Sequence, residues 1–246
     1  MHIVITGGTR GIGQGMAREF LSQGHKVTFS GTSQNSVSNA TKDLKGHFLG
    51  LVCDVRHKSQ IEELLQQAKT QFGNIDIWIN NAGVDQDRLT VDELDETEIK
   101  RVIDINVTGM IFGSAVAIKA MKEQGYGMIY NMEGLGSNNM VIQKTIIYGS
   151  SKRLLTYFSK AAGKELKTYK NIHVGTLQPG MVFTDLLLHN LGDDGMKVAR
   201  ILGNKVDDVA YYLVKKMLQG KKHIKFPSMI KAFPRLLIAP FKKREI

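Results

Sequence analysis

The feature that most constrains the fold of this chain is a glycine-rich turn that follows a short apolar run. Residues 2–6 read as a β-strand, and they lead into Thr6-Gly7-Gly8-Thr9-Arg10-Gly11-Ile12-Gly13 and then a segment with helical periodicity. Gly7 permits a sharp turn, Gly11 lets the backbone approach a ligand, and Gly13 allows close packing of helix on strand. The helix N-terminus then faces bound phosphates. The pattern favours a dinucleotide site over a glycine-rich connection without a ligand.

Short apolar runs alternate with longer amphipathic segments along the rest of the chain, which is typical of a parallel sheet covered by helices on both faces. We predict an α/β, doubly wound Rossmann fold with a seven-stranded parallel sheet, in one domain over 1–246. Strands are expected near 2–6, 25–30, 47–52, 76–80, 127–132, 172–178 and 223–226, and helices near 12–23, 34–44, 58–72, 96–123, 149–169, 205–219 and 228–238. Gly24, Gly73 and Gly125 are expected at helix ends.

Composition excludes several classes of protein. Apolar residues make up 42% of the chain and charged residues 23%, as in globular proteins. Cys53 is the single cysteine, so no intramolecular disulfide forms, and without a signal-peptide pattern we expect a cytoplasmic location. No apolar run approaches the roughly 18 residues of a membrane span. No cluster with metal-ligand spacing appears, so no metal is expected.

The net charge of +10 is concentrated at one end. From Lys221 onward eight basic residues face Glu245 alone, which gives +7 of the total. No nucleic-acid-binding fold accompanies these residues, so nucleic acid is not an expected partner. The basic extension at 227–246 interleaves apolar and basic residues, and it is interpreted as a docked terminal helix, a peripheral membrane contact or a subunit contact.

The second predicted strand ends in Gly31-Thr32-Ser33, where an NAD enzyme usually places a carboxylate for the ribose 2′-hydroxyl. Arg10 is in reach of the 2′-phosphate that NADPH carries, and the hydroxyls of Thr32 and Ser33 are further donors for it. The sequence therefore favours NADPH over NADH. The alternative is that Arg10 is an ordinary exposed charge.

Tyr148 and Lys152 lie four residues apart, on the same face of a predicted helix. A phenol has an ordinary pKa near 10, and a nearby ammonium favours its ionised form. We therefore expect Lys152 to lower the pKa of Tyr148 so that the tyrosine acts as an acid and base near neutral pH. Alone, such a pair is more often a solvated helix face.

Together these motifs resemble the short-chain dehydrogenase/reductase family over nearly the whole chain. The resemblance extends to Asn80-Asn81-Ala82-Gly83, to Asp54-Val55, to Asn106 within 104–109, and to 179–184. It implies an NADP(H)-dependent oxidoreductase that transfers hydride between the nicotinamide and a carbonyl or alcohol substrate. It also implies that Lys152 holds the nicotinamide ribose and Asn106 a proton-relay water, and that the helices at 96–123 and 149–169 pair subunits in a homodimer or homotetramer.

The cofactor contacts implied by the turn, the 2′-phosphate argument and the family resemblance are Thr6, Gly7, Thr9, Arg10, Gly11, Ile12, Gly13, Thr32, Ser33, Asp54, Val55, Asn80, Ala82, Gly83, Pro179, Gly180, Val182 and Thr184.

The chain departs from the family at one catalytic position. The family places a serine about thirteen residues before the tyrosine, where this chain has Gly134 or Leu135, and Ser137 is the nearest hydroxyl. We predict that Ser137 takes the role of binding the substrate carbonyl. The same loop, with 148–153 and 178–188, resembles the chlorophyll b reductase-like branch. The displaced serine also motivates an alternative function, a dinucleotide-binding sensor or regulator that is catalytically weak.

Residues 185–204 are rich in leucine and follow the sixth predicted strand, where this fold binds ligands. They are interpreted as a flexible lid over an apolar substrate. The alternative is a helix that packs its leucines into the core.

Overall fold

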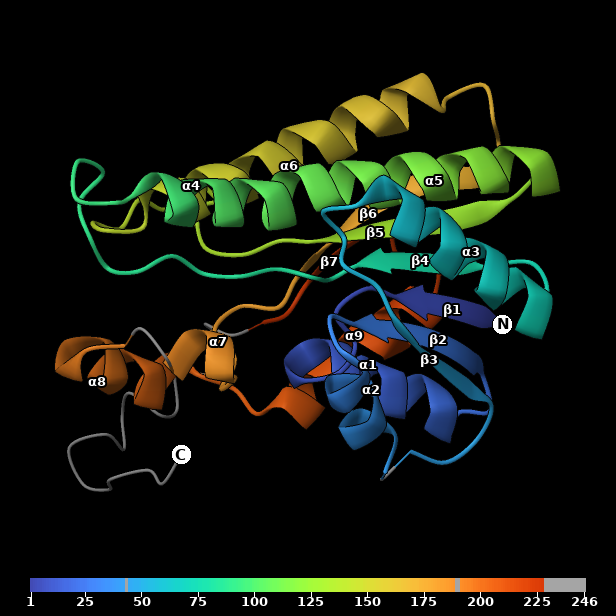
Figure 1. Cartoon of the computed structure of the whole chain (residues 1–246), viewed down its shortest axis with the longest axis horizontal. Coiled ribbons are helices and arrows are strands. Elements are labelled where there is room, and N and C mark those ends of the chain that lie inside the picture. The colour runs from blue at the N-terminus through green and yellow to red at the C-terminus, as the bar shows by residue number, and fades with distance from the viewer. Residues whose placement is uncertain (43, 189–190, 228–246) are drawn as a thin grey trace.

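The computed structural model describes residues 1–42, 44–188 and 191–227, and a parallel sheet of seven strands runs through its centre (Figure 1). The strands are β1 (His2–Ile5), β2 (Lys26–Gly31), β3 (Phe48–Val52), β4 (Ile77–Asn80), β5 (Gly127–Met132), β6 (Ile172–Gln178) and β7 (His223–Lys225). Their spatial order is β3, β2, β1, β4, β5, β6, β7. The order reverses at β1 and β4, and a fold of this kind binds ligands beyond the carboxyl ends of such strands. The predicted Rossmann fold and its seven strands are confirmed.

Helices cover both faces of the sheet (Figure 1). They are α1 (Gly11–Ser22), α2 (Gln34–Thr41), α3 (Lys58–Phe72), α4 (Glu96–Ile103), α5 (Gly109–Gln124), α6 (Ile146–Glu165), α7 (Asp185–Leu188), α8 (Asp193–Leu202) and α9 (Val206–Leu218). One apolar cluster joins α1, α2 and α9 to the sheet, and a second cluster joins α3, α5 and α6 to its other face. The central strand β1 is therefore buried on both sides.

The predicted helix at 96–123 is divided in the structure. A π-helical segment, η1 (Asp104–Thr108), lies between α4 and α5 and carries Asn106. Such insertions are frequent at functional sites, because they turn a side chain away from the helix's regular spacing. The predicted helix at 149–169 begins earlier, at Ile146, so that Tyr148 lies in the first turn of α6. The predicted helix at 228–238 lies outside the described residues.

Residues 185–204 contain two short helices, α7 and α8, which lie beyond the carboxyl ends of the strands (Figure 1). In the described part of the chain, the helical stretch Glu96–Gln124 has the length and apolar composition of a membrane span. Half of its apolar window is buried inside the protein, as in the core helices of soluble proteins. Length and composition alone are weak evidence for a membrane span.

Candidate active site

A large cavity opens at the carboxyl ends of the strands and encloses about 1550 Å³. A pocket for one drug-sized ligand measures roughly 300–1,000 Å³, so this cavity has room for a dinucleotide and a second molecule. The predicted residues that line it are Gly7, Thr9, Arg10, Gly11, Ile12, Gly13, Thr32, Asp54, Val55, Ala82, Gly83, Tyr148, Lys152, Pro179, Gly180, Val182 and Thr184. The predicted residues Thr6, Ser33, Asn80, Asn106 and Ser137 do not line it.

The glycine turn has the geometry expected for close approach of a ligand. Gly7 and Gly11 have φ angles of +64° and +54°, which side chains rarely tolerate. A Cβ on Gly7 would lie 2.8 Å from the Cα of Ala82, and a Cβ on Gly13 would meet the carbonyl oxygen of Gly7. Arg10 precedes α1 without capping it through its side chain. The first N–H groups of α1 are therefore available to a phosphate at the cavity wall.

Thr6 and Asn81 tie the glycine turn to the segment after β4. The Oγ1 atom of Thr6 accepts the backbone N–H groups of Asn81 and Ala82 at 3.1 and 3.2 Å. The Nδ2 atom of Asn81 donates to the carbonyl oxygens of Thr6 and Gly7 at 3.0 and 2.8 Å. Thr6 is buried, so the structure places its side chain behind the turn as a support.

Asn80 is part of a buried polar cluster behind the cavity. Its Oδ1 accepts from Nε1 of Trp78 at 2.8 Å, and its Nδ2 donates to Oγ of Ser114 and Oδ1 of Asn131 at 2.9 and 2.8 Å. These bonds fix the end of β4 to α5 and β5. Asn80 therefore orients the neighbouring segment from behind rather than from the cavity wall.

The cavity wall near the end of β2 carries one guanidinium and one hydroxyl group. Arg10 and Thr32 line the cavity, and the Nη1 atom of Arg10 lies 3.8 Å from Oδ2 of Asp185, with both side chains mostly exposed. Ser33 is placed differently, because its Oγ accepts the N–H of Ser36 at 3.2 Å and caps α2. A serine immediately before a helical segment is the sequence signal that predicts such a cap.

Asp54 and Val55 line the cavity after β3, as predicted. Arg56 holds the Asp54 carboxylate in a two-pronged contact, with Nη2 at 2.5 Å from Oδ2. This hydrogen bond lowers the pKa of Asp54, so the carboxylate stays ionised. The pair adds a fixed polar edge to this end of the cavity.

Tyr148 and Lys152 lie one turn apart on α6, and both face the cavity. The Nζ atom of Lys152 lies 5.7 Å from the centre of the Tyr148 ring and donates to the carbonyl oxygen of Met132 at 3.3 Å. Both side chains are buried, at 9% and 5% exposure. Gly134 lies against the phenol, since a Cβ there would be 2.5 Å from the Tyr148 hydroxyl oxygen.

The expectation of a lowered pKa for Tyr148 is not met in this structure, where the net effect of the surroundings is a rise. Burial raises the pKa of Tyr148, Asp85 raises it further, and Arg88 opposes the rise. Burial also lowers the pKa of Lys152 to about 8, against the opposing effects of Asp85 and Glu133. The physical reason is that both groups leave water together, so desolvation disfavours the charged form of each.

Asn106 connects three parts of the site from behind. Its Oδ1 accepts the N–H of Val84 at 2.9 Å, and its Nδ2 donates to the carbonyl oxygen of Val84 and to Oγ of Ser151 at 2.9 and 3.1 Å. The side chain is buried. It thereby joins η1 to the segment after β4 and to α6, while its predicted role in a proton relay stays a prediction.

Ser137 is turned away from the cavity. Its Oγ accepts the N–H of Gly134 at 3.2 Å and donates to the carbonyl oxygen of Lys152 at 3.1 Å. Arg153 also reaches the carbonyl oxygen of Ser137, at 3.0 Å. These contacts join the loop after β5 to α6 at the lysine, and the role of Ser137 as a substrate donor stays a prediction.

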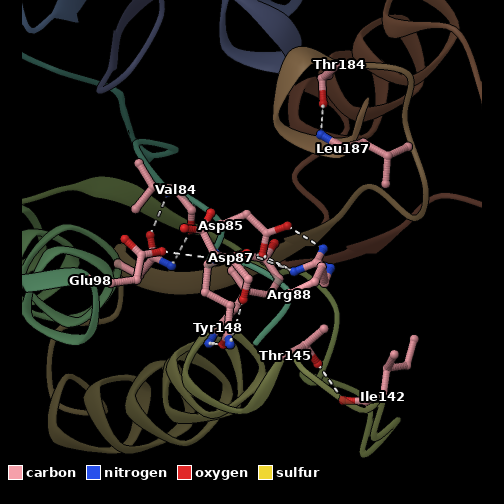
Figure 2. Close-up of polar contacts among 12 residues, drawn as sticks. Val84, Asp85, Asp87, Arg88, Glu98, Ile142, Thr145, Tyr148, Thr184 and Leu187 are labelled. Carbon is pink, nitrogen blue, oxygen red and sulfur yellow. Dashed lines mark hydrogen bonds and ion pairs between the residues drawn. The ribbon is translucent and has the colours of Figure 1, made fainter. Parts of the chain in front are cut away.

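The segment after Gly83 contains site residues that sequence reasoning missed. Figure 2 shows Asp85 and Arg88 above Tyr148 in that view. Nη2 and Nη1 of Arg88 donate to Oδ2 and Oδ1 of Asp85 at 2.6 and 3.1 Å. Gln86 is fully buried, and its Oε1 accepts the N–H of Tyr148 at 2.8 Å. The polar run Asp85-Gln86-Asp87-Arg88 after the fourth strand is the signal in the sequence, although a run of this kind reads as an ordinary solvated loop.

The segments after β6 complete the cavity. Pro179, Gly180, Val182 and Thr184 line it, and Leu186, Leu187 and Leu191 of the region predicted to be a lid line it as well. The Oγ1 atom of Thr184 accepts the N–H of Leu187 at 3.4 Å (Figure 2). The leucines therefore give this side of the cavity an apolar surface, which favours the lid interpretation over packing in the core. His189 lies outside the described residues.

Comparison with known proteins agrees with this geometry. The family model for short chain dehydrogenase matches residues 1–193. The chloroplastic chlorophyll(ide) b reductase NOL of Oryza sativa subsp. japonica is 34% identical, over 96% of this chain and 74% of that protein. Two solved structures share the fold: the closed form of serine dehydrogenase with NADP+ (TM-score 0.81, 24% identity, 92% of this chain and 94% of that one) and the 3-ketoacyl-(acyl-carrier-protein) reductase of Brucella melitensis with NADH (0.81, 23%, 91% and 95%).

Proposed function

This chain belongs to the short-chain dehydrogenase family, and from that premise we propose that it reduces the carbonyl group of an apolar small molecule with NADPH, or runs the reverse oxidation. Members of the family are oxidoreductases that act on carbonyl and alcohol groups of small molecules. The observation that carries the proposal is that Tyr148 and Lys152 line the same cavity as the glycine turn.

The preference for NADPH rests on the wall at the end of β2. Arg10 and Thr32 line the cavity, and β2 ends in Gly31, which Thr32 and Ser33 follow in the place of a carboxylate. Guanidinium and hydroxyl groups suit a 2′-phosphate. The glycines of the turn support a dinucleotide too, because a Cβ on Gly7 or Gly13 would collide with the backbone of Ala82 or Gly7 and displace the turn from the cavity wall. When bound there, the cofactor supplies hydride to the carbonyl carbon.

The chain's own residues supply the proton and the surroundings. Tyr148 donates its hydroxyl proton to the carbonyl oxygen, and Lys152 stabilises the phenolate that this leaves and holds the nicotinamide ribose. The apolar side chains of Leu135, Ile142 and Leu186 line the same cavity and exclude water from the substrate. The name of the rice relative assigns it chlorophyll(ide) b as substrate. For this chain the proposal is an apolar carbonyl compound.

We also propose a homo-oligomer formed through α5 and α6. A groove of about 460 Å³ lies between these helices, and Ile111, Ala115, Ile118 and Phe158 are among the residues that line it. The cytoplasmic location stays a prediction, and the name of the rice relative places that protein in the chloroplast.

The proposal is tested by following NADPH oxidation with a panel of ketones and aldehydes, and NADP+ reduction with alcohols. We expect turnover by the wild type and loss of turnover in Tyr148→Phe with NADPH binding retained. Arg10→Ala should raise the KM for NADPH roughly tenfold or more while changing that for NADH much less, because only NADPH carries the 2′-phosphate.

The alternative function, a sensor that binds dinucleotide without turnover, predicts another result. It requires tight NADPH binding and no turnover of any carbonyl or alcohol in the panel. Family membership and the presence of Tyr148 and Lys152 on the cavity wall do not favour it.

A further inference from the structure

Arg88 is a cation on the wall of the cavity that Tyr148 also lines. The side chain lines the cavity, whereas its partner Asp85 does not. Tyr148 is within the electrostatic reach of both groups. Figure 2 shows the pair on the segment that follows β4, with Thr145 and Ile142 of the next wall to one side.

The guanidinium is held in place by the protein and keeps donors to spare. Its Nη1 donates to Oδ1 of Asp85 at 3.1 Å and to the carbonyl oxygen of Gln86 at 3.0 Å, and its Nη2 donates to Oδ2 of Asp85 at 2.6 Å. An arginine has five N–H donors. Nε and the second hydrogen of Nη2 therefore have no partner among the described residues, and a ligand in the cavity can take them.

The segment that carries Arg88 is itself anchored. Arg101 donates from Nη2 to the carbonyl oxygen of Asp85 at 2.7 Å. The buried Gln86 accepts from the N–H of Tyr148, and Asn106 holds both backbone groups of Val84. These four hydrogen bonds fix the segment that carries Arg88 relative to the start of α6, which is the arrangement that recognition of a fixed substrate group requires.

Charge is distributed unequally between the walls of this part of the cavity. Lys144 lines the cavity on the loop before α6, and it also acts on Glu93. Glu133 also lines the cavity and acts on Lys152, and its carboxylate accepts from Oγ1 of Thr156 at 3.4 Å. Asp85 offsets the charge of Arg88, so Lys144 supplies the further positive charge that attracts an anionic substrate group, and Glu133 repels such a group from its own neighbourhood.

We propose that the substrate carries a carboxylate as well as a carbonyl group, and that Arg88 binds the carboxylate while the carbonyl lies at Tyr148. This inference rests on the proposed function and adds the substrate's charge to it. A planar guanidinium binds a carboxylate through paired hydrogen bonds, and Lys144 adds a second positive charge on the same wall. Leu186, Leu187 and Leu191, which line the cavity, would then cover the apolar body of the molecule.

The test compares a matched acid and ester, 4-carboxybenzaldehyde and methyl 4-formylbenzoate, as substrates with NADPH. We expect the wild type to use the acid with a kcat/KM at least about tenfold higher than the ester, since a hydrogen bond to a charged group typically has an effect of this size. In the double variant Asp85→Asn/Arg88→Gln the acid-to-ester ratio should fall to about one. The two amide side chains of this variant can still contact each other, and because both charges are removed together no buried carboxylate is left without a cation.

A control double variant, Arg18→Gln/Asp207→Asn, removes a similar ion pair on the outer surface, where the two groups lie 2.9 Å apart. It should keep the wild-type activity and ratio. NADPH binding and the thermal midpoint of each variant report on folding.

The outcomes separate the two proposals. Turnover of acid and ester at equal rates by the wild type, or a ratio that the Asp85→Asn/Arg88→Gln change leaves intact, overturns the carboxylate inference and leaves the reductase proposal standing. If neither aldehyde is turned over, calorimetry with 4-(hydroxymethyl)benzoate on the NADPH-loaded enzyme decides. Binding weakened at least about tenfold in the double variant supports the inference, and equal or absent binding overturns it.

Discussion

Lys152 is a cation enclosed by protein, so its burial makes the stability of the fold depend on pH. Burial lowers the pKa of Lys152 to about 8, below the ordinary lysine value of 10.5. Between these two pH values the unfolded chain binds a proton that the folded chain has released, and stability rises with pH wherever the unfolded state binds more protons. Below pH 8 the folded protein bears the full cost of the buried charge.

We therefore predict that wild type gains stability relative to Lys152→Met as pH rises from 8 to 10.5. The gain should approach roughly 3 kcal/mol, because each unit of difference between the folded and unfolded pKa of the lysine corresponds to about 1.4 kcal/mol. Urea unfolding of both proteins at pH 7, 8, 9 and 10 measures it. Tyr148 titrates in both proteins, so its effect largely cancels in the difference. Parallel stability curves would show that the folded lysine keeps its ordinary pKa.

Ser137 connects two elements, the loop after β5 and helix α6. Replacing it with alanine removes the part-buried bond from the N–H of Gly134 and the buried bond to the Lys152 carbonyl. An intramolecular hydrogen bond contributes about 0.5–1.5 kcal/mol net, so we expect the loss of two to lower the free energy of unfolding of Ser137→Ala by about 1–3 kcal/mol. Denaturant unfolding measures the loss.

Kinetics of the same variant distinguish the two roles of Ser137. If the hydroxyl only joins loop and helix, the drop in kcat should be small and NADPH binding should be unchanged. A fall in kcat of about a hundredfold with unaltered stability would instead support the substrate contact that the sequence predicts, because loss of one oxyanion donor has an effect of that size.

At the scale of elements, periodicity and glycines were enough to place every strand and most helices, while the π-helical segment η1 had no signal in the sequence. Its cause is tertiary. Asn106 bonds to Val84 and Ser151, and the helix must bring that side chain inward at one point. The role of Ser33 as a helix cap was open to prediction from local rules, since a serine precedes the helix.

Across the whole molecule, motifs far apart in the sequence converge on one cavity because parallel strands bring their carboxyl ends to one edge. That rule places Gly11, Ala82, Tyr148 and Val182 together from sequence alone. It does not say which side chains turn into the cavity. Ser137 turns away and Arg88 turns in, because packing of the loops decides this and no local pattern records it.

Helices α5 and α6 lie along one outer side of the protein, and we predict that copies of the chain assemble through them (Figure 1). Ala115 is exposed in the groove between them. A long cation at this position would keep a second copy from approaching and would leave a buried charge without a partner. We expect the wild type to have two or four times the chain mass of 27.4 kDa, and Ala115→Arg to have the mass of one chain.

Size-exclusion chromatography with light scattering measures both masses over a range of concentrations. Gln66→Arg, an exposed change on α3, is the matched control and should keep the wild-type mass. A wild type that stays monomeric at every concentration, or an Ala115→Arg protein with the wild-type oligomeric mass, would contradict assembly through this face. Since α6 also carries Tyr148 and Lys152, a monomeric Ala115→Arg that keeps wild-type turnover would show that each subunit holds a complete site.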